Sequence, residues 1–249
     1  MRLKNKIAVI TGGSTGIGLA SAKRFAAEGA TVYITGRRQA ALDAAVAEIG
    51  HGARAIQGDV AKLDELDRIY ATIDDEVGRI DILFANAGVG DVAPLGSITP
   101  EQFDHAFGIN VRGMVFTVQK GLPLMNAGGT IILTGSTTGI MGTPAFSVYS
   151  ATKAAIRNFA RSWALDLKGT GIRVNVLSPG STQTPGLEGV ASSAGVEKEA
   201  MFAAFAEQTP LGRVADASEI AAAAMLLASD DSSFMTGSEV FVDGGLAQV

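Results

Sequence analysis

The chain contains no cysteine, so it can form neither a disulfide bond nor a thiolate metal site. Histidine is almost as scarce, since only His51 and His105 occur among the 249 residues and they lie far apart in the sequence. Zinc sites in enzymes are built largely from these two residue types. We therefore expect no metal centre.

An excess of charge and long hydrophobic runs are lacking as well. The net charge is −5, and acidic and basic residues are mixed along the chain without a basic stripe, which argues against a nucleic-acid partner. No apolar run approaches the roughly 18 residues of a membrane-spanning helix. The apolar part of the start, MRLKNKIAVITGG, is too short for a signal peptide. We predict a cytoplasmic protein that does not bind membranes.

The chain does have a regular alternation of short β-branched runs with longer alanine-rich segments. Several runs, such as IAVI and IIL, are apolar on both faces, which is typical of parallel strands covered by helices. We predict an α/β, doubly wound fold with about seven parallel strands and helices on both faces. The expected strands are residues 6–11, 31–35, 53–57, 81–86, 129–135, 172–178 and 239–243. The expected helices are residues 16–28, 38–49, 62–77, 100–125, 148–168, 197–208 and 216–229.

The first expected strand runs into the sequence TGGSTGIG at residues 11–18. Glycines at a strand-to-helix turn let the backbone approach a pyrophosphate closely, and the helix N-terminus offers N–H groups and the positive end of its dipole. A glycine cluster alone also occurs in ordinary turns, but this one directly follows the first strand. We therefore predict a single Rossmann-type fold with a dinucleotide site that includes Gly12, Gly16 and Gly18.

The end of the second strand predicts which dinucleotide is bound. Folds that hold a ribose 2′-OH carry an acid there, whereas this chain has Gly36 followed by Arg37 and Arg38. Two guanidinium groups entering a helix N-terminus oppose the helix dipole, and a 2′-phosphate between them would remove the conflict. We predict NADP(H) rather than NAD(H); a solvated arginine pair is the alternative.

The alternation of strands and helices continues nearly to the C-terminus without a linker or a low-complexity tract. The exception is the stretch 181–200, which is long, rich in small residues and follows a strand. Such insertions are often mobile lids over a site. We predict one dinucleotide-binding and catalytic domain, residues 1–249, with a mobile substrate lid at about 183–210.

Four motifs occur in one order along the chain: TGGSTGIG at 11–18, NAG at 86–88, YSATK at 149–153 and PG at 179–180. With these motifs the sequence resembles the short-chain dehydrogenase/reductase family over its whole length. Within that family it is most similar to NADP-dependent secondary-alcohol dehydrogenases and ketone reductases. The resemblance implies transfer of a hydride between a nicotinamide and a ketone or secondary alcohol.

The resemblance also implies a catalytic set of four residues: Asn110, Ser136, Tyr149 and Lys153. Tyr149 would be the general acid and base. Bringing a phenol from a pKa of about 10 to about 7 requires roughly 4 kcal/mol, which the Lys153 ammonium one helical turn away and an oxidised nicotinamide would provide. The Ser136 hydroxyl can hold the substrate oxygen. Asn110 would position a water that relays protons to Lys153.

The same resemblance assigns the cofactor contacts, with Asp59 and Val60 beside the adenine and the NAG motif beneath the ribose. The full set is Gly12, Ser14, Thr15, Gly16, Ile17, Gly18, Arg37, Arg38, Asp59, Val60, Asn86, Ala87, Gly88, Tyr149, Lys153, Pro179, Gly180, Thr182 and Thr184. The last four would flank the nicotinamide. One departure from the family is Thr15, because NADP-preferring members often carry a basic residue there. The phosphate preference therefore depends on the two arginines, helped by Ser14.

The loops at 88–96 and 137–146 are rich in Gly, Ala and Pro and have few charges, which favours an apolar, bulky substrate. One alternative is a 3-ketoacyl-carrier-protein reductase. Arg112, Arg157 and Arg161 could contribute a basic patch for the acidic carrier, although the net charge opposes this reading. An alternative of another class is a non-catalytic NADP(H)-binding regulator, against which the intact catalytic set argues.

The expected helices at 100–125 and 148–168 are apolar or small nearly all round. One face of a sheet cannot cover them completely. Ala151, Ala155 and Ser162 would let another helix approach closely. We predict that these helices pack against a second copy of the chain, and the family resemblance implies a homotetramer with the strand at 239–243 near another interface.

Overall fold

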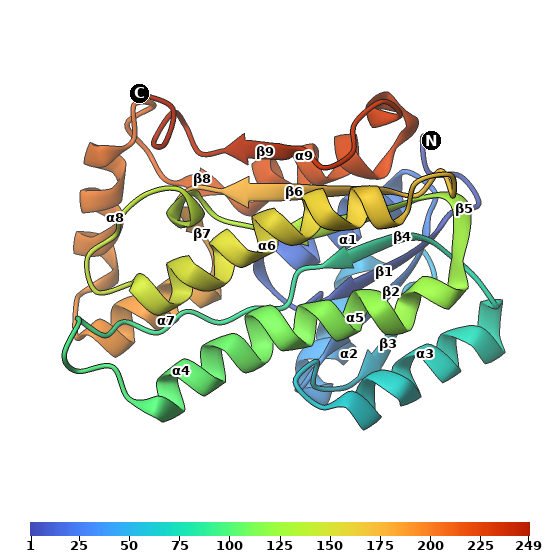
Figure 1. Ribbon diagram of the computed structural model, residues 1–249, viewed down its shortest axis with the longest axis horizontal. Coiled ribbons are helices and arrows are strands. Elements are labelled where there is room, and N and C mark those ends of the chain that lie inside the picture. The colour runs from blue at the N-terminus through green and yellow to red at the C-terminus, as the bar shows by residue number, and fades with distance from the viewer.

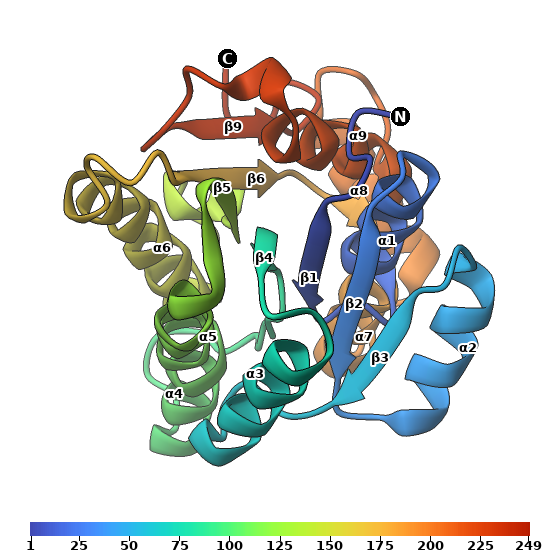
Figure 2. The same cartoon turned by 90° about the vertical axis from the view of Figure 1, so that its right-hand side faces the viewer.

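The computed structural model describes residues 1–249, except for the side chain of Ser193. Seven parallel strands form one sheet in the order β3-β2-β1-β4-β5-β6-β9 (Figures 1 and 2). Their bounds are β1 Ile7–Thr11, β2 Thr31–Gly36, β3 Arg54–Gln57, β4 Ile80–Ala85, β5 Met125–Thr134, β6 Arg173–Pro179 and β9 Glu239–Val242. The short strands β7 (Thr182–Gln183) and β8 (Ala215–Asp216) pair separately. The predicted seven-stranded parallel sheet is confirmed.

Helices cover both faces of this sheet, as Figure 2 shows. On one face lie α1 (Gly16–Ala27), α2 (Gln39–Ile49) and α9 (Ala217–Ala228), and on the other lie α3 (Leu63–Val77), α4 (Pro100–Phe107), α5 (Met114–Gly121) and α6 (Ser147–Asp166). Each face has its own hydrophobic core, because successive strand side chains point to opposite faces. The neighbours Tyr33 and Ile34 are both fully buried, yet they belong to different cores.

The expected helix at 100–125 is not regular. It begins at Pro100, where Thr99 and Gln102 form a reciprocal capping box. Residues Gly108–Gly113 then form a π-helical segment, η1, before α5 begins, and a 3₁₀ turn at Leu122–Leu124 follows α5. A π segment inserts one residue into the helical ladder and often marks a functional site. Amphipathic periodicity alone does not reveal it.

The stretch at 181–200, expected as a lid, contains the helix α7 (Pro185–Ala194), which the sequence reading missed. Its small residues gave no amphipathic pattern, but its start carried a signal. Thr184 caps the helix by accepting a hydrogen bond from the Leu187 backbone N–H at 3.2 Å, and Pro185 occupies the first helical position. The expected helix at 197–208 is present as α8 (Lys198–Gln208).

The strand order reverses between β1 and β4, since β1 pairs with β2 on one side and with β4 on the other. In open α/β sheets, ligands bind at such a reversal, outside the carboxyl ends of the strands. Figure 1 shows α7 and α8 beyond this edge of the sheet. Within the described residues, no helix combines the length and the apolar character needed to cross a membrane.

Candidate active site

The turn between β1 and α1 is built for close backbone approach. A Cβ atom on Gly18 would lie 2.3 Å from the carbonyl oxygen of Gly12, so no larger residue fits there. The side chain of Thr15, which precedes α1, makes no capping hydrogen bond, and the first turn of the helix holds no acidic residue. The helix N-terminus therefore presents N–H groups and positive partial charge to the carboxyl edge, which fits a pyrophosphate.

Asn86 ties three strand ends together at this edge. Its Nδ2 donates to the carbonyl oxygens of Thr11 at 3.0 Å and Gly12 at 3.3 Å, and its Oδ1 accepts from Thr134 Oγ1 at 3.3 Å. The backbone N–H groups of Asn86 and Ala87 donate to Thr11 Oγ1 at 3.0 and 3.1 Å. The predicted NAG motif thus fixes the ends of β1, β4 and β5 relative to one another.

Arg37 and Arg38 lie exposed between the end of β2 and the start of α2. Neither guanidinium group forms an ion pair with any side chain that the structure describes, and the first turn of α2 holds no acid. A Cβ on Gly36 would lie 3.3 Å from Ser14 Oγ, so the serine hydroxyl lies beside this turn. Two unpaired guanidinium groups and a hydroxyl fit a ribose phosphate better than a ribose hydroxyl pair.

The other predicted cofactor residues also lie at the carboxyl edge. Ile17 is in the first turn of α1, and Asp59 and buried Val60 follow β3. A Cβ on Gly88 would lie 3.7 Å from Lys153 Nζ, so the loop after β4 passes beside the lysine.

The segment after β6 closes the same edge. Thr182 Oγ1 donates to the Gly180 carbonyl at 3.0 Å, which fixes the turn that follows Pro179. A Cβ on Gly16 would lie 3.1 Å from Thr184 Cγ2. The start of α7 therefore rests against the glycine turn, and the predicted nicotinamide-flanking residues lie next to the predicted pyrophosphate site.

Three of the four predicted catalytic residues converge where β5 and α6 meet. Ser136 lies two residues beyond the end of β5 and accepts hydrogen bonds from Thr138 N at 3.2 Å and Thr138 Oγ1 at 3.1 Å. On α6, Lys153 Nζ lies 5.4 Å from the centre of the Tyr149 ring and donates to the Thr134 carbonyl at 2.8 Å. The spacing of four residues places Tyr149 and Lys153 on one face of α6, as the sequence predicted.

Burial shifts the pKa values of both Tyr149 and Lys153 in the protein alone. Burial raises the pKa of the Tyr149 phenol to about 12, which a hydrogen bond with the Ser136 hydroxyl partly opposes. Burial also lowers the pKa of Lys153 to about 8. Burial therefore works against the phenolate in the protein alone, and the sequence analysis assigns its stabilisation to two positive charges, the Lys153 ammonium and an oxidised nicotinamide. A phenolate needs a further positive charge in the site.

Asn110 lies in the π segment η1 and is 1% exposed. Its Oδ1 accepts from the Val89 N–H at 2.8 Å, and its Nδ2 donates to the Val89 carbonyl at 2.8 Å and to Thr152 Oγ1 at 3.1 Å. Thr152 Oγ1 in turn donates to the Tyr149 carbonyl at 2.6 Å. The amide therefore clamps the loop after β4 to the helix that carries Tyr149. Its role in water relay stays a prediction.

A cavity borders Tyr149 between α4, the first turn of α6 and the loop after β4. Its lining is mostly apolar, but Asp91 and Gln102 contribute polar groups. The residues that line the cavity are Asp91, Ala93, Ile98, Gln102, Ala106, Ala145, Val148 and Tyr149. The His105 Nδ1 atom lies 3.1 Å from Asp91 Oδ2. The sequence analysis missed Asp91 and Gln102, although Asp91 lies in the loop expected to shape the pocket.

Comparisons with known proteins agree with this fold. Residues 12–247 match the family model described as enoyl-(acyl carrier protein) reductase. The chain is 55% identical to the oxidoreductase asL5 of Sarocladium schorii, over 100% of this chain and 98% of the relative. It is 39% identical to galactitol 2-dehydrogenase of Agrobacterium fabrum, over 98% of each. It is 34% identical to the NADP-dependent (R)-specific alcohol dehydrogenase of Lentilactobacillus kefiri, over 98% of this chain and 97% of that one.

A solved structure described as a short chain dehydrogenase/reductase family protein superposes with a TM-score of 0.87 at 41% identity, covering 100% of both chains. The fold and the site thus define an oxidoreductase of a class that uses nicotinamide cofactors. The chain belongs to the short-chain dehydrogenase/reductase family.

Replacing Lys153 with Met should stabilise the protein at pH 7. The Lys153 side chain is buried, and its pKa falls from 10.5 in the unfolded chain to about 8. At pH 7 the buried group is still charged, at a cost of about 3 kcal/mol, whereas losing its hydrogen bond to Thr134 costs about 1 kcal/mol. We expect a net gain of about 2 kcal/mol in the free energy of unfolding, measured by urea titration.

The pH dependence of this gain has a definite sign. Between pH 8 and 10.5 the unfolded chain binds a proton that the folded wild type has released, so wild-type stability rises with pH and the advantage of Lys153→Met shrinks. Exposed Lys168, just beyond the C-terminal end of α6, is the control, and Lys168→Met should show no such pH-dependent gap. A Lys153→Met protein that is less stable than wild type at pH 7 would contradict the assignment.

Proposed function

We propose that the protein is an NADP-dependent oxidoreductase that transfers a hydride between the nicotinamide and a ketone or secondary alcohol. The observation that carries the proposal is the convergence of Ser136, Tyr149 and Lys153 beside the glycine turn at the carboxyl edge. The names of two relatives, a galactitol dehydrogenase and an alcohol dehydrogenase, support a reaction at a secondary alcohol.

The side chains have separate tasks in this reaction. The Ser136 hydroxyl orients the substrate oxygen, and the Tyr149 hydroxyl gives that oxygen its proton, or removes one when an alcohol is oxidised. Bound NADP(H) supplies or accepts the hydride. The Lys153 ammonium has three N–H donors, of which Thr134 takes one. The others are available for the ribose, and the positive charge favours the phenolate form of Tyr149.

The preference for NADP(H) is supported by Arg37 and Arg38, whose guanidinium groups have no carboxylate partner among the described side chains. The nearest acid in α2, Asp43, accepts a hydrogen bond from Gln39 Nε2 at 2.7 Å and follows the first turn. A 2′-phosphate between the arginines would bind two guanidinium groups and relieve their repulsion.

The substrate that fits the cavity beside Tyr149 has an apolar body. Five of the eight residues that line that cavity are apolar, while Asp91 and Gln102 add polar groups; the apolar five are Ala93, Ile98, Ala106, Ala145 and Val148. The apolar lining supports an apolar substrate, and from the loops at 88–96 and 137–146 we propose a bulky ketone or secondary alcohol. The helices α7 and α8 would act as a lid over it; Lys198 Nζ of α8 lies 3.0 Å from Glu188 Oε1 of α7, so the two can move together.

The 3-ketoacyl-carrier-protein reductase alternative needs a free basic patch. Arg157 is paired with Glu239, and Arg112 donates to the Ala61 carbonyl at 2.9 Å. Of the three arginines expected to form a basic patch, Arg161 is therefore the one whose charge is most available to bind an acidic carrier protein. These contacts favour a free small molecule as substrate over one delivered by an acidic protein.

A homotetramer is the assembly that we propose. The solvent face of α6 carries small residues at Ala151 and Ser162 and an exposed Leu165, while α4 exposes Phe103. The two helices lie on the same face of the sheet (Figure 1). A second copy seated there would cover this apolar surface.

Tyr149→Phe removes only the proposed proton donor. Because general acid–base catalysis contributes about 10²–10⁴-fold, we expect kcat to fall by that factor in NADPH oxidation with a ketone panel, while NADPH binding stays unchanged. The matched control is Tyr70→Phe, which removes a buried hydroxyl bonded to the Thr117 carbonyl on α5 and should leave kcat unchanged. A Tyr149→Phe enzyme with nearly normal kcat would refute the mechanism.

The Arg37→Ala, Arg38→Ala double variant tests the cofactor. Each charged hydrogen bond contributes about 1.5–3 kcal/mol, so the ratio of kcat/KM for NADPH to that for NADH should fall at least about tenfold. Exposed Arg79→Ala is the control with no expected change. A wild type that prefers NADH, or an unchanged ratio in the double variant, would contradict the NADP assignment.

Light scattering tests the assembly. A tetramer of 25.5 kDa chains has a mass of about 102 kDa, four times the monomer value. Ala155→Arg, on the outer side of α6, should lower that mass, whereas Ala47→Arg, exposed on α2 at the opposite face of the sheet, should not. A wild type that runs at 25.5 kDa at micromolar concentration would rule the interface out.

A further inference from the structure

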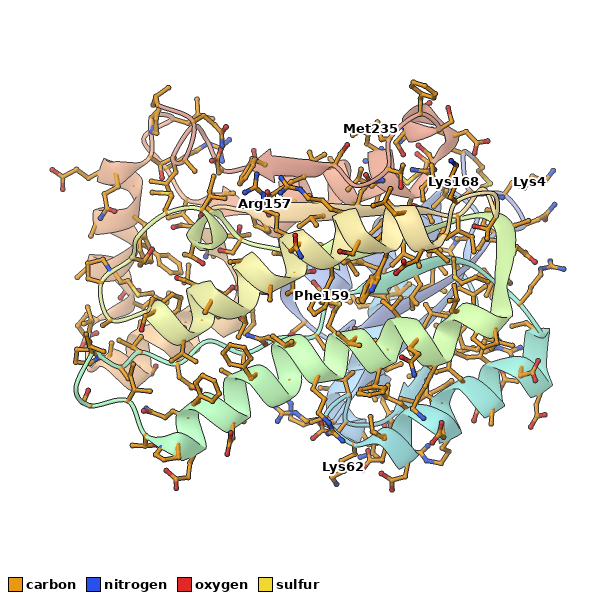
Figure 3. The ribbon with its side chains drawn as sticks, viewed as in Figure 1. Lys4, Lys62, Arg157, Phe159, Lys168 and Met235 are labelled. Carbon is orange, nitrogen blue, oxygen red and sulfur yellow. The ribbon has the colours of Figure 1, made fainter. Side chains whose placement is uncertain are left out.

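A partly buried ion pair joins α6 to the last strand of the sheet. The Glu239 side chain, at the start of β9, is 9% exposed and pairs through Oε2 with Arg157 Nε. Its other oxygen accepts a hydrogen bond from Ser178 Oγ of β6 at 2.7 Å. Figure 3 shows Arg157 extending from α6 toward β6 and β9. One carboxylate therefore connects a helix, a central strand and the edge strand.

The Ser178 end of this connection lies directly beneath the Ser136 turn. Ser178 is fully buried, and a Cβ on Gly135 would lie 2.2 Å from Ser178 Oγ. The Gly135 N–H donates to the Leu177 carbonyl at 2.8 Å. The backbone that leads into Ser136 therefore rests on the Ser178 hydroxyl, and the direction of that hydroxyl is set by Glu239.

The Arg157 end lies on the helix that carries the other catalytic side chains. Arg157 follows Lys153 by four residues, so the two side chains leave α6 on neighbouring turns of one face. A shift of α6 relative to β9 would break the ion pair, and a shift of the Ser136 turn would disturb the Ser178 hydrogen bond. A partly buried charge pair resists such shifts, because separating it leaves charge uncompensated.

We propose that Arg157, Glu239 and Ser178 are positioning residues that hold the Ser136 turn in register with Tyr149 and Lys153. This inference rests on the proposed function, because it concerns the geometry of its proton transfer. None of the three side chains needs to touch the substrate. They act through the Gly135–Ser136 backbone on one side and through α6 on the other.

The chain contains a second network of the same chemistry that serves as a matched control. Glu76 of α3 accepts a hydrogen bond from Tyr33 Oη at 2.8 Å and forms an ion pair with Arg54. It likewise links a helix to two neighbouring strands, β2 and β3. Arg54 begins β3, at the amino edge of the sheet and away from the catalytic edge. Changing Glu76 therefore perturbs a carboxylate, hydroxyl and guanidinium set without perturbing the Ser136 turn.

The experiment compares Glu239→Gln with Glu76→Gln in the full-length protein. Because a displacement of about 1 Å can cost about 10²-fold in rate, we expect Glu239→Gln to lower kcat by about 10–100-fold while KM for NADPH stays within about twofold. Glu76→Gln should leave kcat within about twofold of wild type. Equal effects of the two changes on kcat would overturn the proposal.

Ser178→Ala keeps the ion pair and removes only the hydroxyl, so it provides a milder variant if Glu239→Gln folds poorly. Its kcat should also fall, and the double variant Ser178→Ala, Glu239→Gln should lose no more than Glu239→Gln alone, because both act through one turn. Independent, additive losses would contradict the shared path. A Ser178→Ala enzyme with wild-type kcat would do so as well.

Crystal structures of the two Gln variants separate this inference from the proposed function. We expect the distance between Ser136 Oγ and Tyr149 Oη to change in Glu239→Gln and to match wild type in Glu76→Gln. An unchanged distance in Glu239→Gln overturns the positioning role, whatever the activity. A wild-type protein that reduces no ketone refutes the proposed function, whereas the structures still decide the positioning role.

Discussion

Burial of the Lys153 ammonium is the interaction on which the site depends most. The group is 4% exposed, and it donates a hydrogen bond to the Thr134 carbonyl at the end of β5. That bond fixes α6 against the strand that leads to Ser136, and so it sets the positions of the catalytic side chains. The same burial disfavours the charge. The fold therefore holds a destabilising cation beside the Tyr149 ring.

Other buried polar groups at this edge secure the frame around that cation. Asn86 joins the ends of β1, β4 and β5, and Asn110 joins the loop after β4 to α6. Both amides use their donors and acceptors on groups of the protein itself. A satisfied amide fixes geometry without adding charge, which leaves Tyr149 and Lys153 as the pair whose protonation can change.

The sequence alone predicts those features of the fold that depend on residues close together in the chain. The seven strands follow from β-branched runs, and the spacing of Tyr149 and Lys153 follows from helical periodicity. The π segment at Gly108–Gly113 and the helix α7 were missed, because neither has a distinct apolar period. The bond between Ser178 and Glu239 joins residues 61 apart in the chain. Only the pairing of β6 with β9 brings them together, so no local pattern predicts that contact.

The two edges of the sheet differ in how their charges are compensated. At the amino edge, buried Asp81 accepts hydrogen bonds from the Ile7 N–H at 2.8 Å and from Asn126 Nδ2 at 2.9 Å, and Lys6 Nζ lies 3.7 Å away. Charge there is compensated within the protein.

At the carboxyl edge, Arg37, Arg38 and Lys153 have no carboxylate partner among the described side chains. The N-terminus of α1 adds positive potential. A chain with a net charge of −5 thus keeps a locally positive edge, and repulsion among these groups falls when an anion with several phosphates enters. An edge whose positive charges lack partners among the described side chains is therefore one that an anionic dinucleotide would stabilise.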